Sequence, residues 1–131
     1  MDRVQSSPAA EAFWSYTRAF QSQDPRAVAA HFNEPAMMIT PRGVHALSNR
    51  AAVEQLYASL MAEMPQNYAR TEFERADERR LGDGLTELSG SGTWVDTSGQ
   101  KFMPFGMTYT LRRTDQGWRI VMAIIHAADA A

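Results

Sequence analysis

The sequence predicts an α+β fold in which helices cover one face of a curved, mostly antiparallel sheet. Apolar residues recur at helical spacing through the first half of the 131-residue chain. In the second half they alternate with polar residues at a period of two, as in strands. The turns between the alternating segments are short, which makes sequential strands antiparallel neighbours. Helices followed by a run of strands are typical of the α+β class.

Two helices are expected near the start of the chain. Ser7-Pro8 combines a capping side chain with a proline at the first helical position, and this helix should continue to about Gln23. Asp24-Pro25 repeats the start signal for a short second helix, which we expect to end at Pro35. The apolar face of the second helix is predicted to contain Val28, His31 and Phe32.

A third helix has the clearest periodicity in the chain. Ser48 or Asn49 caps its start, and Pro65 ends it. Its apolar stripe is formed by Val53, Leu56, Tyr57, Leu60, Met61 and Met64.

Six strands are predicted. Ala36–Thr40 forms a short strand before the third helix, and Gly43–Leu47 pairs back against it across Pro41-Arg42. Four longer strands follow the helix, over Tyr68–Leu81, Leu85–Asp96, Lys101–Arg113 and Gly117–Ala127.

Composition excludes several classes of function. The chain has a net charge of −2 and no basic run, which argues against a nucleic-acid partner. It has no cysteine, so disulfides, thiol catalysis and cysteine metal sites are excluded. No apolar run is long enough to span a membrane, and the polar N-terminus lacks a secretory signal. We therefore expect a single cytoplasmic domain, residues 1–131, with no membrane contact.

Alternation predicts which residues of the last strand face the helices. One set comprises Trp118, Ile120, Met122, Ile124 and His126, and we expect it to point inward. In the strand 85–96, Gly90 and Gly92 fall on the inward set. Glycines within a strand mark a close approach or a bend. They predict either a gap in the core that could serve as a pocket, or a bend of the sheet.

The order and spacing of these features resemble the nuclear transport factor 2-like superfamily. The resemblance covers about residues 9–127 and rests on Gln23-Asp24-Pro25, His31-Phe32, the segment 36–43 (AMMITPRG) and the segment 117–121 (GWRIV). The superfamily includes SnoaL-like cyclases, ketosteroid isomerase, scytalone dehydratase and limonene-epoxide hydrolase. The resemblance implies a cone-shaped, cystatin-like fold with a pocket between three helices and the sheet. It also implies a homodimer through the outer sheet face, here Thr108, Thr110, Val121, Ala123 and Ile125.

The superfamily's known catalytic residues match this chain at one position. Tyr16 falls where ketosteroid isomerase has its oxyanion-hole tyrosine, and a phenol can stabilise a developing oxyanion. The isomerase's general base falls on Thr40, and its second oxyanion group falls on Met107. Threonine is not a base near neutral pH, and methionine donates no hydrogen bond. The acidic groups of the cyclases and of the epoxide hydrolase also lack counterparts on the inward positions.

Histidine 126 is the remaining candidate for a general base. A histidine titrates near neutral pH, and partnered with Tyr16 or Tyr109 it could move a proton while a phenol stabilises the oxyanion. The alternative is a solvated histidine at the end of a strand. His31 is expected to cap the second helix, and His45 to lie at the surface or the pocket rim. The spacing of the three histidines does not predict a metal site.

The pocket implied by the fold would be apolar and rich in methionine, although core packing explains the same residues. Its predicted lining is Phe20, Thr40, Tyr57, Met61, Gly90, Gly92, Trp94, Phe105, Met107, Tyr109, Met122 and Ile124. We expect a cofactor-independent isomerase, cyclase or lyase acting on a small apolar molecule by acid/base chemistry. The alternative is a non-catalytic module that binds a small molecule or associates as a dimer.

Overall fold

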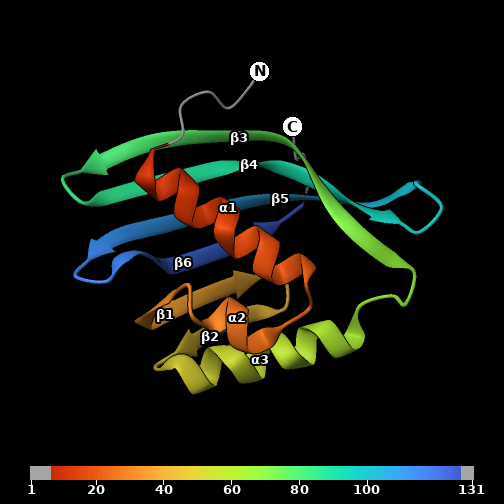
Figure 1. Cartoon of the computed structure of the whole chain (residues 1–131), viewed down its shortest axis with the longest axis horizontal. Helices are drawn as coiled ribbons and strands as arrows, with labels where there is room; N and C mark the ends of the chain where they lie inside the picture. Colours follow the sequence, from red (N-terminus) through yellow and green to blue (C-terminus); the bar gives the residue numbers. More distant parts are fainter. Residues whose placement is uncertain (1–6, 128–131) are drawn as a thin grey trace.

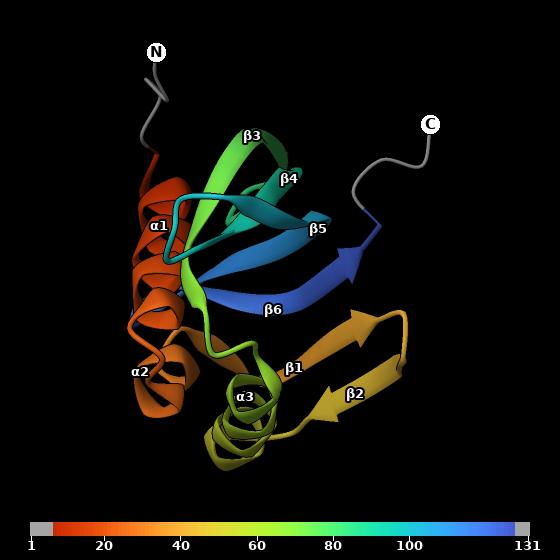
Figure 2. The same cartoon turned by 90° about the vertical axis from the view of Figure 1, so that its right-hand side faces the viewer.

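Three helices lie on the same side of a six-stranded sheet in the computed structural model, which describes residues 7–127 (Figure 1, Figure 2). The elements in chain order are α1 (Pro8–Gln21), α2 (Pro25–Ala29), β1 (Phe32–Thr40), β2 (Gly43–Leu47), α3 (Arg50–Glu63), β3 (Tyr68–Gly82), β4 (Leu85–Asp96), β5 (Lys101–Thr114) and β6 (Gly117–His126). The α+β prediction is confirmed.

The sheet has the strand order β2-β1-β6-β5-β4-β3. β1 runs parallel to β6, and every other neighbouring pair is antiparallel. The sheet is strongly curved but open, so β2 and β3 form its two edges (Figure 2). None of the helices within residues 7–127 combines the length and apolar character needed to cross a membrane.

The predicted helix starts are confirmed by their capping contacts. The side chains of Ser7, Asp24 and Asn49 each accept a hydrogen bond from a backbone N–H in the turn that follows. Each cap satisfies an N–H group that the helix itself leaves unpaired. The third helix ends at Glu63, just before the predicted stop at Pro65.

The predicted end of the second helix is wrong. α2 stops at Ala29, and Phe32 already belongs to β1, so Pro35 lies inside a strand. The reason is pairing with β6: the backbone N–H of Ile120 donates to the carbonyl of His31 at 2.9 Å. Because of this contact, β1 begins at Phe32, three residues before Pro35, and the proline does not end the helix.

A bulge in β6 reverses the predicted faces of its second half. Thr110 pairs with Met122 and Leu111 pairs with Ile120, which leaves Val121 as an extra residue. Ile120 is buried in the core as expected, but beyond the bulge Ala123 is buried and Ile125 packs against the core. Met122 and Ile124 therefore face away from the helices. The expectation that Ala123 and Ile125 lie on the outer face is wrong for the same reason.

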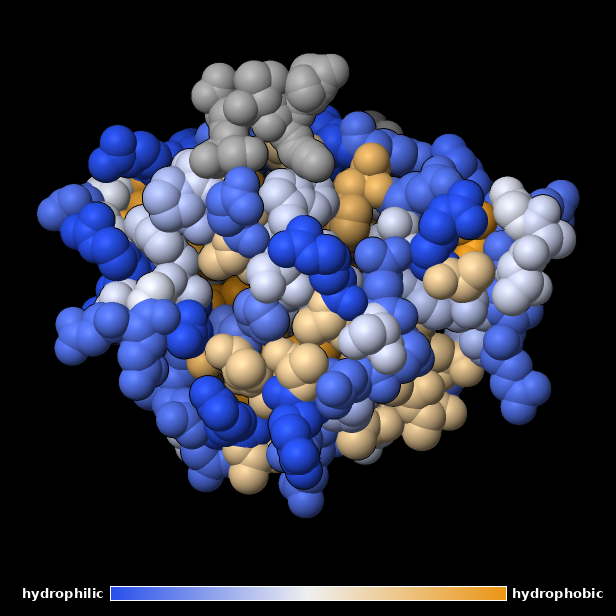
Figure 3. All heavy atoms as spheres, in the orientation of Figure 1, coloured by the Kyte–Doolittle hydropathy of each residue, from blue (hydrophilic) through white to orange (hydrophobic). Residues whose placement is uncertain are grey.

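The core lies between the helices and the concave face of the sheet. Its largest fully buried side chains are Tyr57, Phe13, Leu88, Met107, Leu111, Ile120, Val28, Val53 and Val95. The side of the molecule on which α1 lies is largely hydrophilic, with apolar residues scattered over it (Figure 3).

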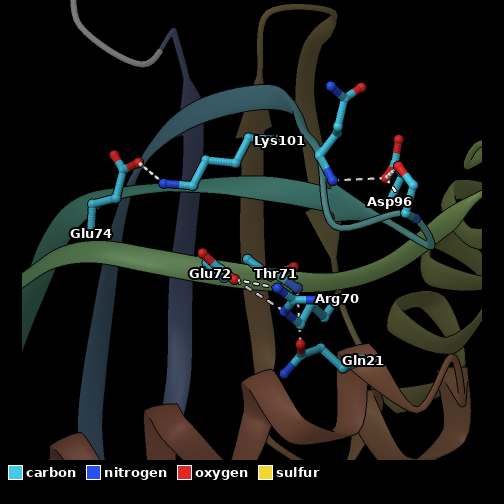
Figure 4. Close-up of polar contacts among 9 residues, drawn as sticks. Gln21, Arg70, Thr71, Glu72, Glu74, Asp96 and Lys101 are labelled. Atoms are coloured by element: carbon cyan, nitrogen blue, oxygen red, sulfur yellow. Dashed lines mark hydrogen bonds and ion pairs between the residues drawn. The ribbon is translucent and has the colours of Figure 1, made fainter.

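A side-chain hydrogen bond links the end of α1 to β3. The backbone N–H of Thr71 donates to the side-chain oxygen of Gln21 at 2.9 Å (Figure 4). Exposed ion pairs involve the same strand, one between Arg70 and Glu72 within β3 and one between Glu74 of β3 and Lys101 of β5. Such surface pairs contribute little to stability, so the helix is held by core packing, by the Gln21 contact and by the hydrogen bond from the Ser7 hydroxyl to Glu78 of β3.

Candidate functional site

Three tyrosines meet in the centre of the core. Tyr16 comes from α1, Tyr57 from α3 and Tyr109 from β5. The hydroxyl of Tyr16 lies 2.7 Å from that of Tyr57 and 2.8 Å from that of Tyr109. The residues are only 5%, 2% and 5% exposed, respectively. The structure therefore brings together Tyr16, Tyr109 and Tyr57, the first two predicted as candidate phenols and the third predicted to line the pocket.

Burial keeps this cluster neutral. Desolvation raises the pKa of all three tyrosines well above the ordinary value, and the electrostatic effect of the neighbouring phenols raises it further. Hydrogen bonds within the cluster offset part of this increase in pKa for Tyr16 and Tyr57. Three hydroxyl protons share two hydrogen bonds within the cluster, so one proton remains to be donated elsewhere. Within residues 7–127 no other acceptor bonds to these hydroxyls. The cluster can thus donate one hydrogen bond to a carbonyl or oxyanion that reached it.

The predicted gap at Gly90 and Gly92 is wrong. A Cβ atom on Gly90 would overlap the backbone carbonyl of Arg75, and one on Gly92 would lie 2.8 Å from the carbonyl oxygen of Glu72. The backbone of β3 therefore fills the space that the missing side chains leave. The alternative prediction, a bend of the sheet, is what these glycines permit.

His126 does not face the tyrosine cluster, and its predicted inward direction is wrong. It pairs with Gly106 on the outer face of the sheet, where its ring covers the glycine. Its Nδ1 atom lies 3.0 Å from the carbonyl oxygen of Ala127, and the side chain is exposed. The bulge at Val121 causes this reversal. The proposed pairing of His126 with Tyr16 or Tyr109 is therefore not formed.

The other residues predicted to line the pocket lie in three places: in the core, at the margin of the sheet and on its outer face. Met107 is buried with the tyrosines, and Phe105 and Met61 pack against the core. Phe20 stacks edge-on against Tyr57, at 6.2 Å between ring centroids. Thr40 accepts a hydrogen bond from the N–H of Arg42 at the β1–β2 turn.

An aromatic path leads from the cluster to the surface. The half-buried rings of Phe20 and Tyr68 are 6.3 Å apart, and those of Tyr68 and Trp94 are 5.4 Å apart. Movement of these rings would be needed before a molecule could reach Tyr57. The remaining two predicted lining residues, Met122 and Ile124, face outward.

His31 makes a contact that sequence reasoning only half anticipated. Its Nδ1–H donates to the carbonyl of Ala27 at 2.9 Å, which confirms the predicted capping of α2. Its Nε2 atom lies 3.0 Å from the hydroxyl of Ser15, a contact between helices that no local pattern reveals. Because a carbonyl only accepts, neutral His31 carries its proton on Nδ1 and accepts from Ser15. Burial lowers the pKa of His31 and favours this neutral form.

Known structures with this architecture include several of undefined activity. A cystatin-like domain of unknown function from Nostoc punctiforme aligns with a TM-score of 0.77 at 16% identity, covering 100% of this chain and 81% of that chain. A ketosteroid isomerase-like protein from Erwinia carotovora atroseptica aligns at 0.72 and 15% identity, covering 98% and 99%.

A protein from Xanthomonas campestris described as a calcium/calmodulin-dependent protein kinase II association domain aligns with a TM-score of 0.71 at 19% identity, covering 93% of this chain and 86% of that chain. Identities this low establish the fold alone. A comparison with curated proteins found no match. Residues 6–128 match the family described as NTF2-like protein (DUF6841). The chain therefore belongs to this NTF2-like family.

Proposed function

We propose that this protein is an association module that pairs with a second copy of itself through the outer face of the sheet. The observation that carries the proposal is an apolar patch on the face that no helix of residues 7–127 covers (Figure 2). The outer patch consists of Met37, Ile39, Val44, Met122 and Ile124. Val44 is exposed, and the other four side chains are half-buried. Val44 is 65% exposed, although burying such a side chain is favourable.

The register of the strands makes the outer patch continuous. Met37 pairs with Met122 and Ile39 pairs with Ile124 across the parallel β1–β6 contact. Val44 pairs with Ile39 on the other side. Residues directly opposite one another in a sheet share a face. Thr108 pairs with Ile124, and its hydroxyl lies 3.3 Å from that of Ser89, so the patch has a polar border on the β5 side, as the rim of an interface has.

A two-fold contact suits this surface because the same patch serves both partners. An apolar patch on one copy then meets the same apolar patch on the other. The resemblance to an association domain in another protein supports the same proposal. Thr108 and Thr110, expected on this face, are compatible with it, since both are half-buried and alternate with the inward Met107 and Tyr109.

Sedimentation velocity at micromolar concentration tests the proposal. We expect a dimer for the unmodified protein and a monomer for Ile124→Lys, because the lysine would place an unpaired charge in the apolar contact. Leu81→Lys is the matched control, since Leu81 is 42% exposed at the far edge of the sheet and should leave the dimer intact. A monomeric unmodified protein, or a dimer that survives Ile124→Lys, would contradict the proposal.

A second candidate function is favoured by the surplus proton of the tyrosine cluster. The cluster would donate a hydrogen bond to the oxyanion of a small apolar substrate during isomerisation, cyclisation or elimination. The ketosteroid isomerase-like neighbour supports this candidate. Such a function requires Phe20 and its neighbours to open the aromatic path, and a base other than His126.

A further inference from the structure

The two edges of the sheet differ in chemistry. The β3 edge is long, interrupted by three register shifts, and carries alternating charges over 70–80. Charges and bulges of this kind prevent another strand from pairing at an edge. The β2 edge, GVHAL, contains no Asp, Glu, Lys or Arg. It therefore lacks the protection that its opposite edge has.

The backbone of β2 has free hydrogen-bonding groups at this edge. Thr40 and Gly43 pair directly across the two-residue turn, and such a closing pair is hydrogen-bonded. Bonded and non-bonded pairs alternate along an antiparallel ladder. The N–H and C=O groups of Val44 and Ala46 therefore point away from β1. Within residues 7–127 no other backbone group bonds to them.

A shallow depression of about 490 Å³, wide open to solvent and called the hollow below, lies between β2 and α3 beside these free groups. α3 runs alongside β2 at the end of the sheet (Figure 1, Figure 2). The helix contributes Ala52, Gln55, Leu56 and Ser59, which recur at i, i+3, i+4 and i+7 and so share one face. No lining residue is an Asp, Glu, Lys or Arg, so the hollow suits an uncharged occupant.

We propose that an uncharged, extended peptide segment of a partner protein adds to the sheet at β2 as a further strand. Free donors and acceptors on residues two apart match the repeat of an extended backbone. Pairing with Val44 and Ala46 would supply four backbone hydrogen bonds. The peptide residue opposite His45 would then point to the α3 side of the sheet, because His45 pairs with the inward-facing Met38. Its side chain would enter the hollow against Leu56.

A peptide pair tests whether backbone pairing is the basis of recognition. The probe is a fluorescent hexapeptide of alternating threonine and valine, blocked at both ends. The control is the same peptide N-methylated at alternate residues, which keeps the side chains but loses the N–H groups that face one edge. We expect saturable binding of the probe and at least a roughly tenfold loss of affinity for the control. Absence of binding, or equal binding of both peptides, overturns the proposal.

Variants of the protein locate the binding edge. Ala46→Pro removes an N–H that β1 does not use, and proline is tolerated at such a position of an edge strand. We expect it to weaken probe binding at least about tenfold, whereas Ala46→Val keeps the N–H and should bind as the unmodified protein does. Ser59→Arg fills the hollow from an exposed helix position, and Ala58→Arg is its control outside the hollow. Probe binding unaffected by Ala46→Pro and Ser59→Arg overturns the proposal.

Amide exchange and sedimentation complete the test. The amides of Val44 and Ala46 should exchange fast in the free protein and become protected when the probe binds. If the protein instead self-associates and Ala46→Pro makes it monomeric, the edge is occupied by a second copy, and the partner-peptide proposal is overturned. A dimer lost only in Ile124→Lys belongs to the outer patch and leaves this proposal standing, provided that the probe binds.

Discussion

At the scale of single residues, the tyrosine cluster combines structural and chemical properties. Tyr16 is its centre, because its hydroxyl bonds to both Tyr57 and Tyr109, whereas each of those bonds to Tyr16. Buried hydroxyls that lose their partners keep the full cost of desolvation. Removing one of these hydrogen-bonded hydroxyls should therefore lower the free energy of unfolding.

We expect Tyr16→Phe to reduce the free energy of unfolding by about 1–3 kcal/mol, since it leaves two buried phenols without a partner. Tyr57→Phe is the matched comparison and should cost less, because it removes one hydrogen bond instead of two. Urea unfolding measures both values. A neutral or stabilising Tyr16→Phe would indicate a polar site maintained at the expense of stability, and would favour the acid/base candidate over the association module.

His31 should make stability depend on pH. Its pKa is lowered from 6.5 by burial, and the positive charges of Arg119 and Arg18 add to this. The unfolded chain therefore takes up a proton at a higher pH than the folded protein does. Neutral His31 therefore contributes fully to the free energy of unfolding above about pH 6.5, and this contribution declines as the pH falls below that value.

Unfolding in urea between about pH 7.5 and 5.5 should show this decline, and His31→Gln should flatten it because the titrating group is removed. The informative quantity is the slope of the free energy of unfolding against pH, because a loss of packing lowers stability equally at every pH and leaves this slope unchanged. An unchanged slope in His31→Gln would mean that other groups cause the pH dependence.

At the scale of elements, strand alternation predicted the six strands but not their irregularities. The four long strands begin at the predicted residues, and Asn49 caps α3 as expected. One extra residue at Val121 then moves Met122, Ile124 and His126 to the other face. A one-residue shift inverts every side chain beyond it, and a bulge among Val, Met and Ile leaves no polar residue that would mark its place.

The close contact between β3 and β4 yields a direct prediction. Gly90→Ala should destabilise the protein by about 1–3 kcal/mol or more, because its Cβ would overlap the backbone of Arg75 instead of a movable side chain. Gly82→Ala is the control, since nothing lies within 4 Å of its Cβ position. Thermal unfolding measures both. A tolerated Gly90→Ala would mean that β3 can move away and that a space can open under the sheet.

At the scale of the whole molecule, two surfaces of residues 7–127 are candidates for binding a partner, and they are chemically distinct. The outer patch is apolar and extends over β2, β1 and β6, which suits another folded surface. The edge of β2 offers backbone groups beside a hollow, which suits a single extended strand. Val44 belongs to both, with its side chain on the outer face and its N–H and C=O at the edge. Ile124→Lys and Ala46→Pro should therefore have separable effects on self-association and on peptide binding.

The sequence by itself determined the helix starts, the strands and the family resemblance, because caps, turns and periodicity are local or follow from the order of elements along the chain. It also singled out Tyr16, Tyr57 and Tyr109. Only the tertiary structure decided that they bond to one another, that β3 closes over Gly90 and that His126 faces outward. These outcomes depend on strand register and on contacts between distant segments. A register shift of one residue changes few local interactions but exchanges the inside of a sheet for its outside.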